Sequence, residues 1–251
     1  MKLSGNTILI TGGGSGIGQA LAISLAGMGN TVVVCGRRQN KLDETVEREP
    51  RIKAYCCDVT EPLAVENLRR KLHADEYKIN VLINNAAILN YYNFSKPSEF
   101  NLDDAQQEIN CNLTAPIGLT MALLPQLLEH PQPYIINVGS PGGLVAISPS
   151  PLYSASKAGL HAFTQVLRLH LKGKAKVIEV FPPTVATEMT TDLARNKVTS
   201  EQCVTAILAG LKKDSDEVWV GEGKLVRLMV NLLPPSWVFR LVNSQPSMQV
   251  K

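Results

Sequence analysis

Long uninterrupted apolar segments are missing from this chain of 251 residues. The longest apolar stretch, Leu225 to Val242, is broken by charged, polar and proline residues, which excludes an ordinary membrane-spanning helix. Near the N-terminus the apolar run Thr7–Ile10 is too short for the core of a signal peptide and leads directly into glycines. We therefore expect a cytoplasmic protein in which residues 222–251 form an apolar C-terminal extension. The interrupting residues are Arg227, Asn231, Pro234, Pro235 and Arg240.

Metal-ligand spacings and strong basic clusters are also lacking. The four histidines and five cysteines show no spacing that suits a metal site, so we expect none. The net charge of +3 is mild, and the basic residues are scattered apart from Arg37–Arg38 and a lysine group at 172–176, which argues against nucleic-acid binding. An odd number of cysteines, mostly inside apolar runs, favours buried free thiols in a reducing compartment. They are Cys35, Cys56, Cys57, Cys111 and Cys203.

Short β-branched runs alternate along the chain with longer segments of helical period. This alternation predicts an α/β fold, a doubly wound parallel sheet of about seven strands with helices on both faces. No linker, composition break or internal repeat divides the chain, so a single domain over 1–251 is expected. In such sheets ligands collect outside the carboxyl ends of the strands. The expected strands are Thr7–Ile10, Thr31–Cys35, Ile52–Cys57, Val81–Asn84, Tyr134–Val138, Lys176–Phe181 and Glu217–Val220.

A glycine-rich turn follows the first expected strand and leads into an apolar helix over Ile17–Met28. Its glycines let the backbone turn sharply and approach phosphates, whose charge would meet the amide groups and dipole of the helix N-terminus. The arrangement suits the pyrophosphate of a dinucleotide, and the alternative is an ordinary flexible turn. The residues expected to contact the cofactor here are Gly12, Gly14, Ser15, Gly16, Ile17 and Gly18.

The end of the second expected strand bears on the type of nucleotide. A carboxylate there would accept hydrogen bonds from the ribose of NAD, but this chain has Gly36 followed by Arg37 and Arg38. Guanidinium groups suit the 2′-phosphate of NADP, so NADP(H) is expected in preference to NAD(H). Two solvated arginines at the start of a helix are the alternative. Asp58, after the third strand, either faces the adenine amine or caps a helix with Thr60 nearby.

Two Tyr-x-x-x-Lys pairs occur, Tyr153 with Lys157 and Tyr92 with Lys96. Residues four apart share one face of a helix, and an ammonium beside a phenol favours the phenolate. A tyrosine that normally titrates near ~10 could then exchange a proton with a substrate near neutral pH. The spacing alone does not choose between the pairs, although Pro97 ends any helix that Lys96 would join.

In order along the chain, these motifs resemble the short-chain dehydrogenase/reductase family in its compact form with one Rossmann-type domain. The resemblance covers Thr7 to about Thr190 and includes Thr-Gly-x-x-x-Gly-x-Gly from Thr11. The family places a serine about a dozen residues before its tyrosine, a condition that Ser140 meets for Tyr153, whereas Ile79 stands in that place before Tyr92. The other matching positions are Asp58, Asn84 to Ala86, Asn112, Lys157, Pro182 and Thr187.

The resemblance implies an oxidoreductase that interconverts a carbonyl and an alcohol. Arg37 and Arg38 favour NADP(H), and excess NADPH would make reduction the physiological direction. Tyr153 would move the proton on the substrate oxygen, which Ser140 would position. Lys157 would lower the pKa of the phenol and hold the nicotinamide ribose. Asn112 would anchor a relay water, with Asn110 as the competing choice and a merely polar helix residue as the alternative. The further cofactor contacts implied are Val59, Asn85, Ala86, Ala87, Tyr153, Lys157, Pro182, Val185 and Thr187.

Two positions depart from the family pattern. Ala87 replaces the usual glycine after Asn-Asn-Ala and should be tolerated if its φ is negative. Pro183 replaces the glycine of the usual Pro-Gly pair after the sixth strand, which leaves the geometry near the nicotinamide open. A catalytically inactive nucleotide-binding sensor and an epimerase or dehydratase of the extended type are rival interpretations. The intact catalytic set argues against the first, and chain length argues against the second.

Substrate contacts are expected from Pro141 to Leu152 and from a helical region on the substrate side over 187–212. The apolar residues of the first segment suit an apolar carbonyl or alcohol compound, although they could equally pack in the core. The resemblance also implies a homodimer or homotetramer. The apolar extension could cover the pocket, extend a subunit interface or touch lipid, and core or interface packing is favoured over membrane contact.

Overall fold

A single parallel sheet of seven strands organises the computed structural model, which describes residues 1–190 and 197–244. The strand order is β3-β2-β1-β4-β5-β6-β7, so the chain reverses direction across the sheet between β1 and β4. Every strand paired in the sheet is parallel to its neighbours. The strands are β1 (Thr7–Thr11), β2 (Thr31–Gly36), β3 (Lys53–Cys56), β4 (Val81–Asn84), β5 (Tyr134–Val138), β6 (Lys176–Phe181) and β7 (Glu217–Trp219).

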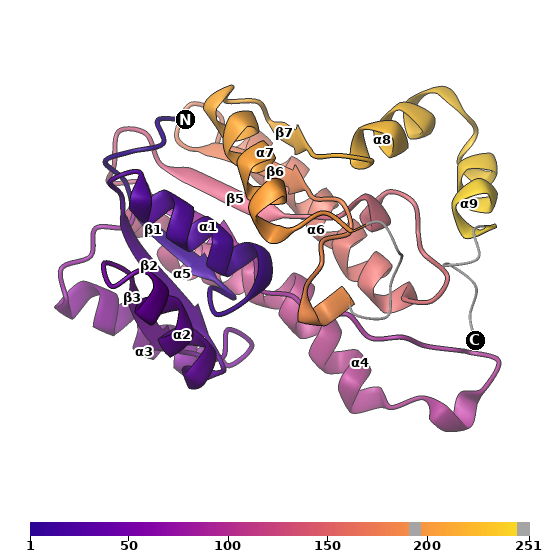
Figure 1. Ribbon diagram of the computed structural model, residues 1–251, viewed down its shortest axis with the longest axis horizontal. Helices are drawn as coiled ribbons and strands as arrows, with labels where there is room; N and C mark the ends of the chain where they lie inside the picture. The colour runs from indigo at the N-terminus through magenta and orange to yellow at the C-terminus, as the bar shows by residue number, and fades with distance from the viewer. Residues whose placement is uncertain (191–196, 245–251) are drawn as a thin grey trace.

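Helices cover both faces of this sheet (Figure 1). All seven expected strands are present, with ends shifted by one residue at β1, β2, β3 and β7. The first helix runs over Gly16–Gly27, one residue earlier at each end than expected. The helices are α1 (Gly16–Gly27), α2 (Gln39–Arg48), α3 (Pro62–Ala74), α4 (Leu102–Ile109), α5 (Ala115–Leu127), α6 (Pro151–His170), α7 (Ser200–Lys212), α8 (Gly223–Leu232) and α9 (Pro235–Asn243).

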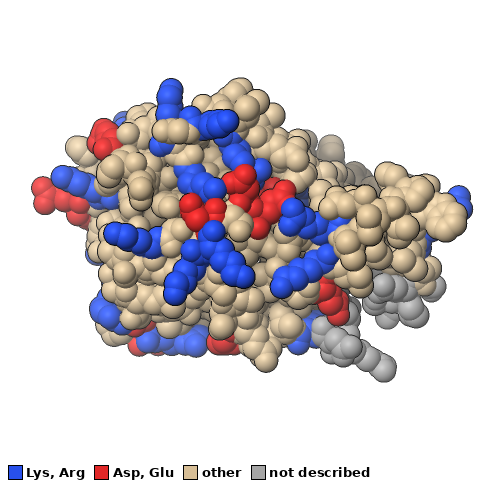
Figure 2. Space-filling view, turned by 90° about the horizontal axis from the view of Figure 1, so that it is seen from above, with Lys and Arg blue, Asp and Glu red and all other residues tan. Residues whose placement is uncertain are grey.

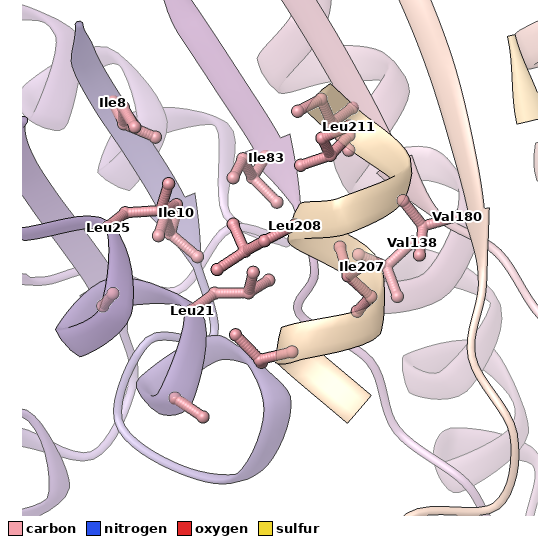
Figure 3. Packing of buried hydrophobic residues seen from close by; sticks show 14 of the residues in the cluster. Ile8, Ile10, Leu21, Leu25, Ile83, Val138, Val180, Ile207, Leu208 and Leu211 are labelled. Carbon is pink, nitrogen blue, oxygen red and sulfur yellow. The ribbon is translucent and has the colours of Figure 1, made fainter. Parts of the chain in front are cut away.

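The core lies in two layers, one on each face of the sheet. On one face α1 and α7 pack against each other and against the aliphatic side chains of the strands. Figure 3 shows Leu21 and Leu25 of α1 meeting Leu208 of α7 over Ile10 of β1. On the other face α3, α5 and α6 cover a second aliphatic cluster. Both faces of the strands are therefore apolar, as a parallel sheet with helices on each side requires.

One row of polar side chains crosses the second face near the carboxyl ends of the strands. Asn84, Asn137 and Glu179 lie in register on β4, β5 and β6, and all three are buried. Asn84 donates to the Asn137 side chain at 2.8 Å, and Asn137 donates to Thr164 of α6 at 2.8 Å. Burying such groups is costly unless they are hydrogen-bonded, so the row ties α6 to a fixed position on the sheet.

Local sequence explains where the helices that approach this edge begin. Pro151 occupies the first turn of α6, where its missing N–H costs no hydrogen bond. The helix therefore starts before Tyr153, and both members of the Tyr153–Lys157 pair lie inside it. At α7 the Thr199 hydroxyl accepts from the Gln202 N–H at 3.2 Å, and the Gln202 side chain accepts from the Thr199 N–H at 3.0 Å. This capping box fixes the first turn of α7.

The C-terminal helices α8 and α9 project from the body of the molecule (Figure 1). Their exposed apolar residues contrast with the mixed charges over the body, and Figure 2 shows a largely uncharged lobe at the right. Asn243, at the end of α9, donates to the Ala146 carbonyl at 2.9 Å and accepts from the Ser148 N–H at 2.7 Å. The extension is thereby attached to the loop before α6. No helix in the described ranges is long and apolar enough to cross a membrane.

Candidate active site

A cavity of about 410 Å³ opens at the carboxyl ends of the central strands. It lies beside the reversal point between β1 and β4, where ligands bind in doubly wound sheets. The described residues that line it are Gly12, Ser15, Gly16, Ile17, Arg38, Asn85, Ala86, Ala87, Ile88, Leu89, Val138, Gly139, Tyr153, Lys157, Pro182, Thr187, Glu188 and Met189. Twelve of them were predicted from the sequence.

The glycine turn between β1 and α1 forms one wall. Gly12 and Gly16 have φ values of +68° and +55°, which favour glycine. A Cβ on Gly18 would lie 2.3 Å from the Gly12 carbonyl oxygen, so α1 can pack this close to the turn only with glycine there. The turn presents backbone and the start of α1 to the cavity, as an anion site at a helix N-terminus requires.

Hydrogen bonds to β4 hold this turn in place. The Thr11 hydroxyl accepts from the backbone N–H groups of Asn85 and Ala86, both at 2.9 Å. The Asn85 side chain donates to the Thr11 carbonyl at 2.9 Å. The Asn-Asn-Ala motif therefore clamps the glycine turn through Asn85, while Asn84 belongs to the buried polar row.

The two arginines after β2 take different positions. Arg38 lines the cavity, donates to the Ser15 hydroxyl at 3.1 Å and pairs with Glu188 at 2.8 Å. Arg37 instead lies 3.7 Å from the Asp58 carboxylate. Asp58 also accepts from the N–H and hydroxyl of Thr60, at 2.9 and 2.7 Å. The helix that follows has Glu61 as its N-cap, so the alternative that Asp58 caps it is wrong.

The catalytic candidates meet at the start of α6. Ser140 lies close enough to Tyr153 to act on the pKa of the phenol, and its hydroxyl accepts from the Gly142 N–H at 3.0 Å. The Lys157 ammonium donates to the Val138 carbonyl at 2.8 Å and stands 5.7 Å from the centre of the Tyr153 ring. Tyr153 and Lys157 line the cavity, whereas Ser140 does not.

Burial controls the protonation of this pair. It raises the pKa of the Tyr153 phenol above its usual value, while the Ser140 hydrogen bond acts in the opposite direction. Burial also lowers the pKa of Lys157 to about 8. The expected lowering of the phenol pKa by Lys157 is not seen, because loss of solvent is the largest influence on the phenol and the Glu108 charge acts in the same direction. Tyr153 therefore carries its proton at neutral pH and can donate it.

Asn112 lies in a π-helical segment, Asn110–Thr114, between α4 and α5. It is fully buried, and its amide donates to the Ile88 carbonyl at 2.8 Å and to the Ser156 hydroxyl at 3.1 Å. Its Oδ1 accepts from the Ile88 N–H at 2.8 Å. Both amide protons are thus engaged, and the side chain ties the loop after β4 to α6. The relay role of Asn112 stays a prediction. Because both amide protons are engaged, Asn112 would have to hold a relay water through one of its oxygen atoms.

The structure accommodates the two departures from the family pattern, Ala87 and Pro183. Among the described non-glycine residues a positive φ occurs at Glu76 and Asp214, so Ala87 is unstrained, as expected. Pro182 lines the cavity, and Pro183 packs beside Gly221. Tyr92 lies in a loop against Phe94 and Phe100, outside any helix. The Tyr92–Lys96 pair therefore lacks the helical arrangement of Tyr153 and Lys157.

Other predicted site residues lie outside the cavity lining. The region predicted on the substrate side contains a short turn at Glu188–Thr190 and α7, whose buried face packs in the core against α1. Residues 191–196 of that region lie outside the described residues. The predicted residues that do not line the cavity are Gly14, Gly18, Arg37, Asp58, Val59, Asn112, Ser140 and Val185.

Six lining residues were not named as site residues, although Gly139 was expected at the crevice and Glu188 and Met189 lie in the segment expected to contact substrate. Ile88 and Leu89 continue directly from the Asn-Asn-Ala-Ala run, and Val138 and Gly139 end β5 just before Ser140. Their positions at the ends of strands could have identified them as cavity residues from the sequence. Glu188 and Met189 lie 150 residues from Arg38, and nothing in the sequence connects those segments.

The short chain dehydrogenase family model matches residues 6–198, and the chain belongs to the short-chain dehydrogenase/reductase family. It is 36% identical over 226 residues to "Uncharacterized oxidoreductase DltE" of Bacillus subtilis (strain 168), across 87% of this chain and 89% of the relative. The prediction of a Rossmann-type doubly wound sheet is confirmed. As a member of this family, the protein is an oxidoreductase.

Two solved structures have closely similar folds. A short-chain dehydrogenase from Burkholderia cenocepacia J2315 in complex with NADP is 26% identical, with a TM-score of 0.84 and coverage of 96% of this chain and 99% of the other. A short-chain dehydrogenase/reductase from Burkholderia phymatum in complex with NAD is 19% identical, with a TM-score of 0.82 and coverage of 100% and 98%. The second similarity concerns the fold alone.

Proposed function

We propose that this protein is an NADP(H)-dependent reductase that converts an apolar carbonyl compound to an alcohol, with Tyr153 as the proton donor. The observation that carries the proposal is that Tyr153 and Lys157 line the same cavity as the glycine turn, with Ser140 acting on the Tyr153 phenol. One ligand in this cavity could contact the turn and Tyr153 together. That is the arrangement required of a dinucleotide cofactor beside a proton donor.

The cavity residues fit a dinucleotide. At Gly12 and Gly16 no side chain stands between the backbone and a pyrophosphate. The turn needs glycine at both positions, since an added Cβ would lie 2.9 Å from Ala86 or Thr187. Arg38 and Ser15 supply a guanidinium and a hydroxyl for a 2′-phosphate. The NADP complex of the Burkholderia cenocepacia relative supports the same choice. Arg38, rather than Arg37, is our candidate for the phosphate contact.

The protein residues have separate tasks in the proposed reaction. Bound NADPH would supply the hydride that reduces the carbonyl carbon. Tyr153 donates a proton to the carbonyl oxygen, and solvent returns that proton afterwards. Ser140 orients the oxygen, and the Lys157 ammonium holds the nicotinamide ribose while its charge stabilises the phenolate left after transfer. The raised pKa of Tyr153 suits a donor that must be protonated before reaction.

The substrate side of the cavity supports an apolar compound. Ile88, Leu89 and Met189 line it, and they present no charge to a ligand. The loop before α6, held by Asn243, stands next to Tyr153 and contains Val145 and Ile147. A homodimer or homotetramer stays a prediction from the family.

The direct test is NADPH oxidation across a panel of aldehydes, ketones and quinones. We expect turnover by the wild type and a fall in kcat of roughly 100-fold or more in Tyr153→Phe, which removes the proton donor. Tyr92→Phe is the matched control, since it removes the hydroxyl of the other Tyr-x-x-x-Lys pair and should retain turnover. Equal turnover by Tyr153→Phe would refute the assigned acid. NADPH binding without turnover of any carbonyl would favour the inactive sensor.

A further inference from the structure

A buried ion pair lies one helical turn beyond Lys157. His161 follows Tyr153 and Lys157 at the same four-residue spacing on α6, so all three share one face of the helix. Its Nδ1 lies 2.7 Å from Oε2 of Glu179 on β6. The Glu179 side chain is 0% exposed. Neither residue lines the cavity, and the proposed reaction does not use them.

The second oxygen of Glu179 has no hydrogen-bond partner among the described residues. A Cβ added to Gly139 would lie 2.5 Å from this oxygen, so glycine is needed for the carboxylate to sit there. Gly139 directly follows Val138, whose carbonyl accepts from the Lys157 ammonium at 2.8 Å. The unpaired oxygen therefore lies next to the end of β5, whose Val138 carbonyl binds Lys157. A buried carboxylate oxygen without a hydrogen bond destabilises the folded protein, which suggests that the negative charge of Glu179 has a functional role.

Glu179 is the anion that acts on Lys157. The titratable groups that face the ammonium are Tyr153 on α6, Cys111 in the π-helical segment and Glu179 on β6. Burial raises the pKa of the Cys111 thiol, as it does that of the Tyr153 phenol, so both are neutral near pH 7. No described carboxylate forms an ion pair with Lys157. The Glu179 charge favours the ammonium form of Lys157, and a charge acts more strongly in a medium of low dielectric constant than in water.

We propose that Glu179 and His161 are positioning residues for Lys157: the carboxylate, fixed by His161, is the counter-charge that keeps the buried side chain in its ammonium form against the Val138 carbonyl. Burial alone opposes that form, since it favours a neutral amine. The inference rests on the proposed function, because the ammonium form matters where Lys157 holds the nucleotide ribose and stabilises the Tyr153 phenolate.

Several charged groups besides Glu179 lie around His161, and they determine which substitution can serve as a control. Its ring faces Glu179 on β6, Glu217 on β7 and Arg168 on its own helix. The hydrogen bond that His161 donates to Glu179 raises the pKa of His161 above its usual value. Gln165 lies 3.0 Å from its other ring nitrogen. Glu217 therefore offers a carboxylate that acts on His161 but not on Lys157.

The test is Glu179→Gln, which keeps the size of the side chain and a hydrogen bond to His161 but removes the charge. We expect the pH above which NADPH affinity and kcat/KM decline to fall by about one unit, because Lys157 then loses its proton at lower pH. Glu217→Gln is the matched control and should leave that pH unchanged. Glu179→Asp should restore the wild-type pH profile, even if the protein is less stable.

Each outcome decides the proposal. A pH profile of Glu179→Gln that equals that of the wild type, or an equal shift in Glu217→Gln, would overturn it. If Glu179→Gln does not fold, replacement of the pair by apolar side chains, Glu179→Met with His161→Phe, provides the same test with the same expected shift. The NADPH affinity profile needs no turnover. A wild type that binds NADPH but reduces no carbonyl would thus contradict the proposed function and still test the counter-charge.

Discussion

Arg38 and Glu188 form an ion pair of 2.8 Å at the edge of the cavity, although 150 residues separate them in the chain. Glu188 also lies 3.5 Å from Lys41, so a single carboxylate pairs with two cations at this edge. The Arg38 and Lys41 charges lower the pKa of Glu188, which keeps it ionised. A 2′-phosphate bound to Arg38 would have to share this guanidinium with Glu188.

We therefore predict that Glu188→Gln binds NADPH more tightly. The substitution removes a negative charge that competes with the phosphate, and the gain should be a few-fold because the pair is exposed. NADH affinity should change little. Glu44→Gln is the matched control, since Glu44 pairs with Lys41 at 3.0 Å and forms no ion pair with Arg38. Fluorescence titration with both nucleotides at low and high salt measures the effect, and weaker NADPH binding would contradict the prediction.

The two arginines should differ when each is replaced. Arg38→Ala removes a cavity residue with a charge-assisted contact to the phosphate, so the Kd for NADPH should rise about tenfold or more relative to that for NADH. Arg37→Ala should alter nucleotide preference far less, because Arg37 is placed beside Asp58. Titration of both variants with NADPH and NADH measures the ratio. A larger effect from Arg37 would contradict the proposal that Arg38 makes the phosphate contact.

A methyl group on Gly18 should damage the glycine turn. In Gly18→Ala the added carbon would lie 2.3 Å from the Gly12 carbonyl and 2.5 Å from the Asn85 amide, which cannot both move freely. We expect a loss of about 1–3 kcal/mol in the free energy of unfolding and weak nucleotide binding. Gly27→Ala in the same helix has open space around it and should cost nothing. Urea unfolding compares the two, and equal stabilities would refute the predicted clash.

Stability should depend on pH through His161. Its pKa is raised in the folded protein by the hydrogen bond that it donates to Glu179. Its contribution to stability is therefore complete below the unfolded value near ~6.5 and is lost as pH rises through the folded value. Between pH 6 and 8 the wild type should therefore lose more stability than His161→Gln. Urea unfolding at both pH values measures the difference. Parallel losses would show that this hydrogen bond adds no pH-dependent stability.

Sequence patterns were sufficient for the sheet and for the catalytic pair. β-branched runs and strand-end glycines depend on local chemistry, and they located all seven strands and the turn before α1. Tyr153 and Lys157 could be chosen over Tyr92 and Lys96 because Ser140 matches the serine of the family pattern and because Pro97 ends any helix that Lys96 would join. The pattern also paired Ser140 with Tyr153, and in the structure Ser140 acts on the pKa of that phenol.

Other features depended on contacts between distant segments. Arg37 and Arg38 are neighbours in sequence, and only the approach of Asp58 and Glu188 separates their positions. The rise in the Tyr153 pKa comes from packing that no spacing reveals. Asn112 matched the family, but its clamp on Ile88 follows from the path of the loop after β4. Glu179 lay inside an apolar strand and gave no signal of its hydrogen bond to His161.

The buried polar row on β4, β5 and β6 also controls alignment of the strands. Side chains alternate between the faces of a strand, so a slip of one residue would turn Asn84, Asn137 or Glu179 into the aliphatic layer beneath α1 and α7. The amide and carboxylate groups would lose their partners there. Alternative pairings of these strands are thereby disfavoured during folding. The correct register of β5 in turn places Ser140, which follows this strand, near Tyr153.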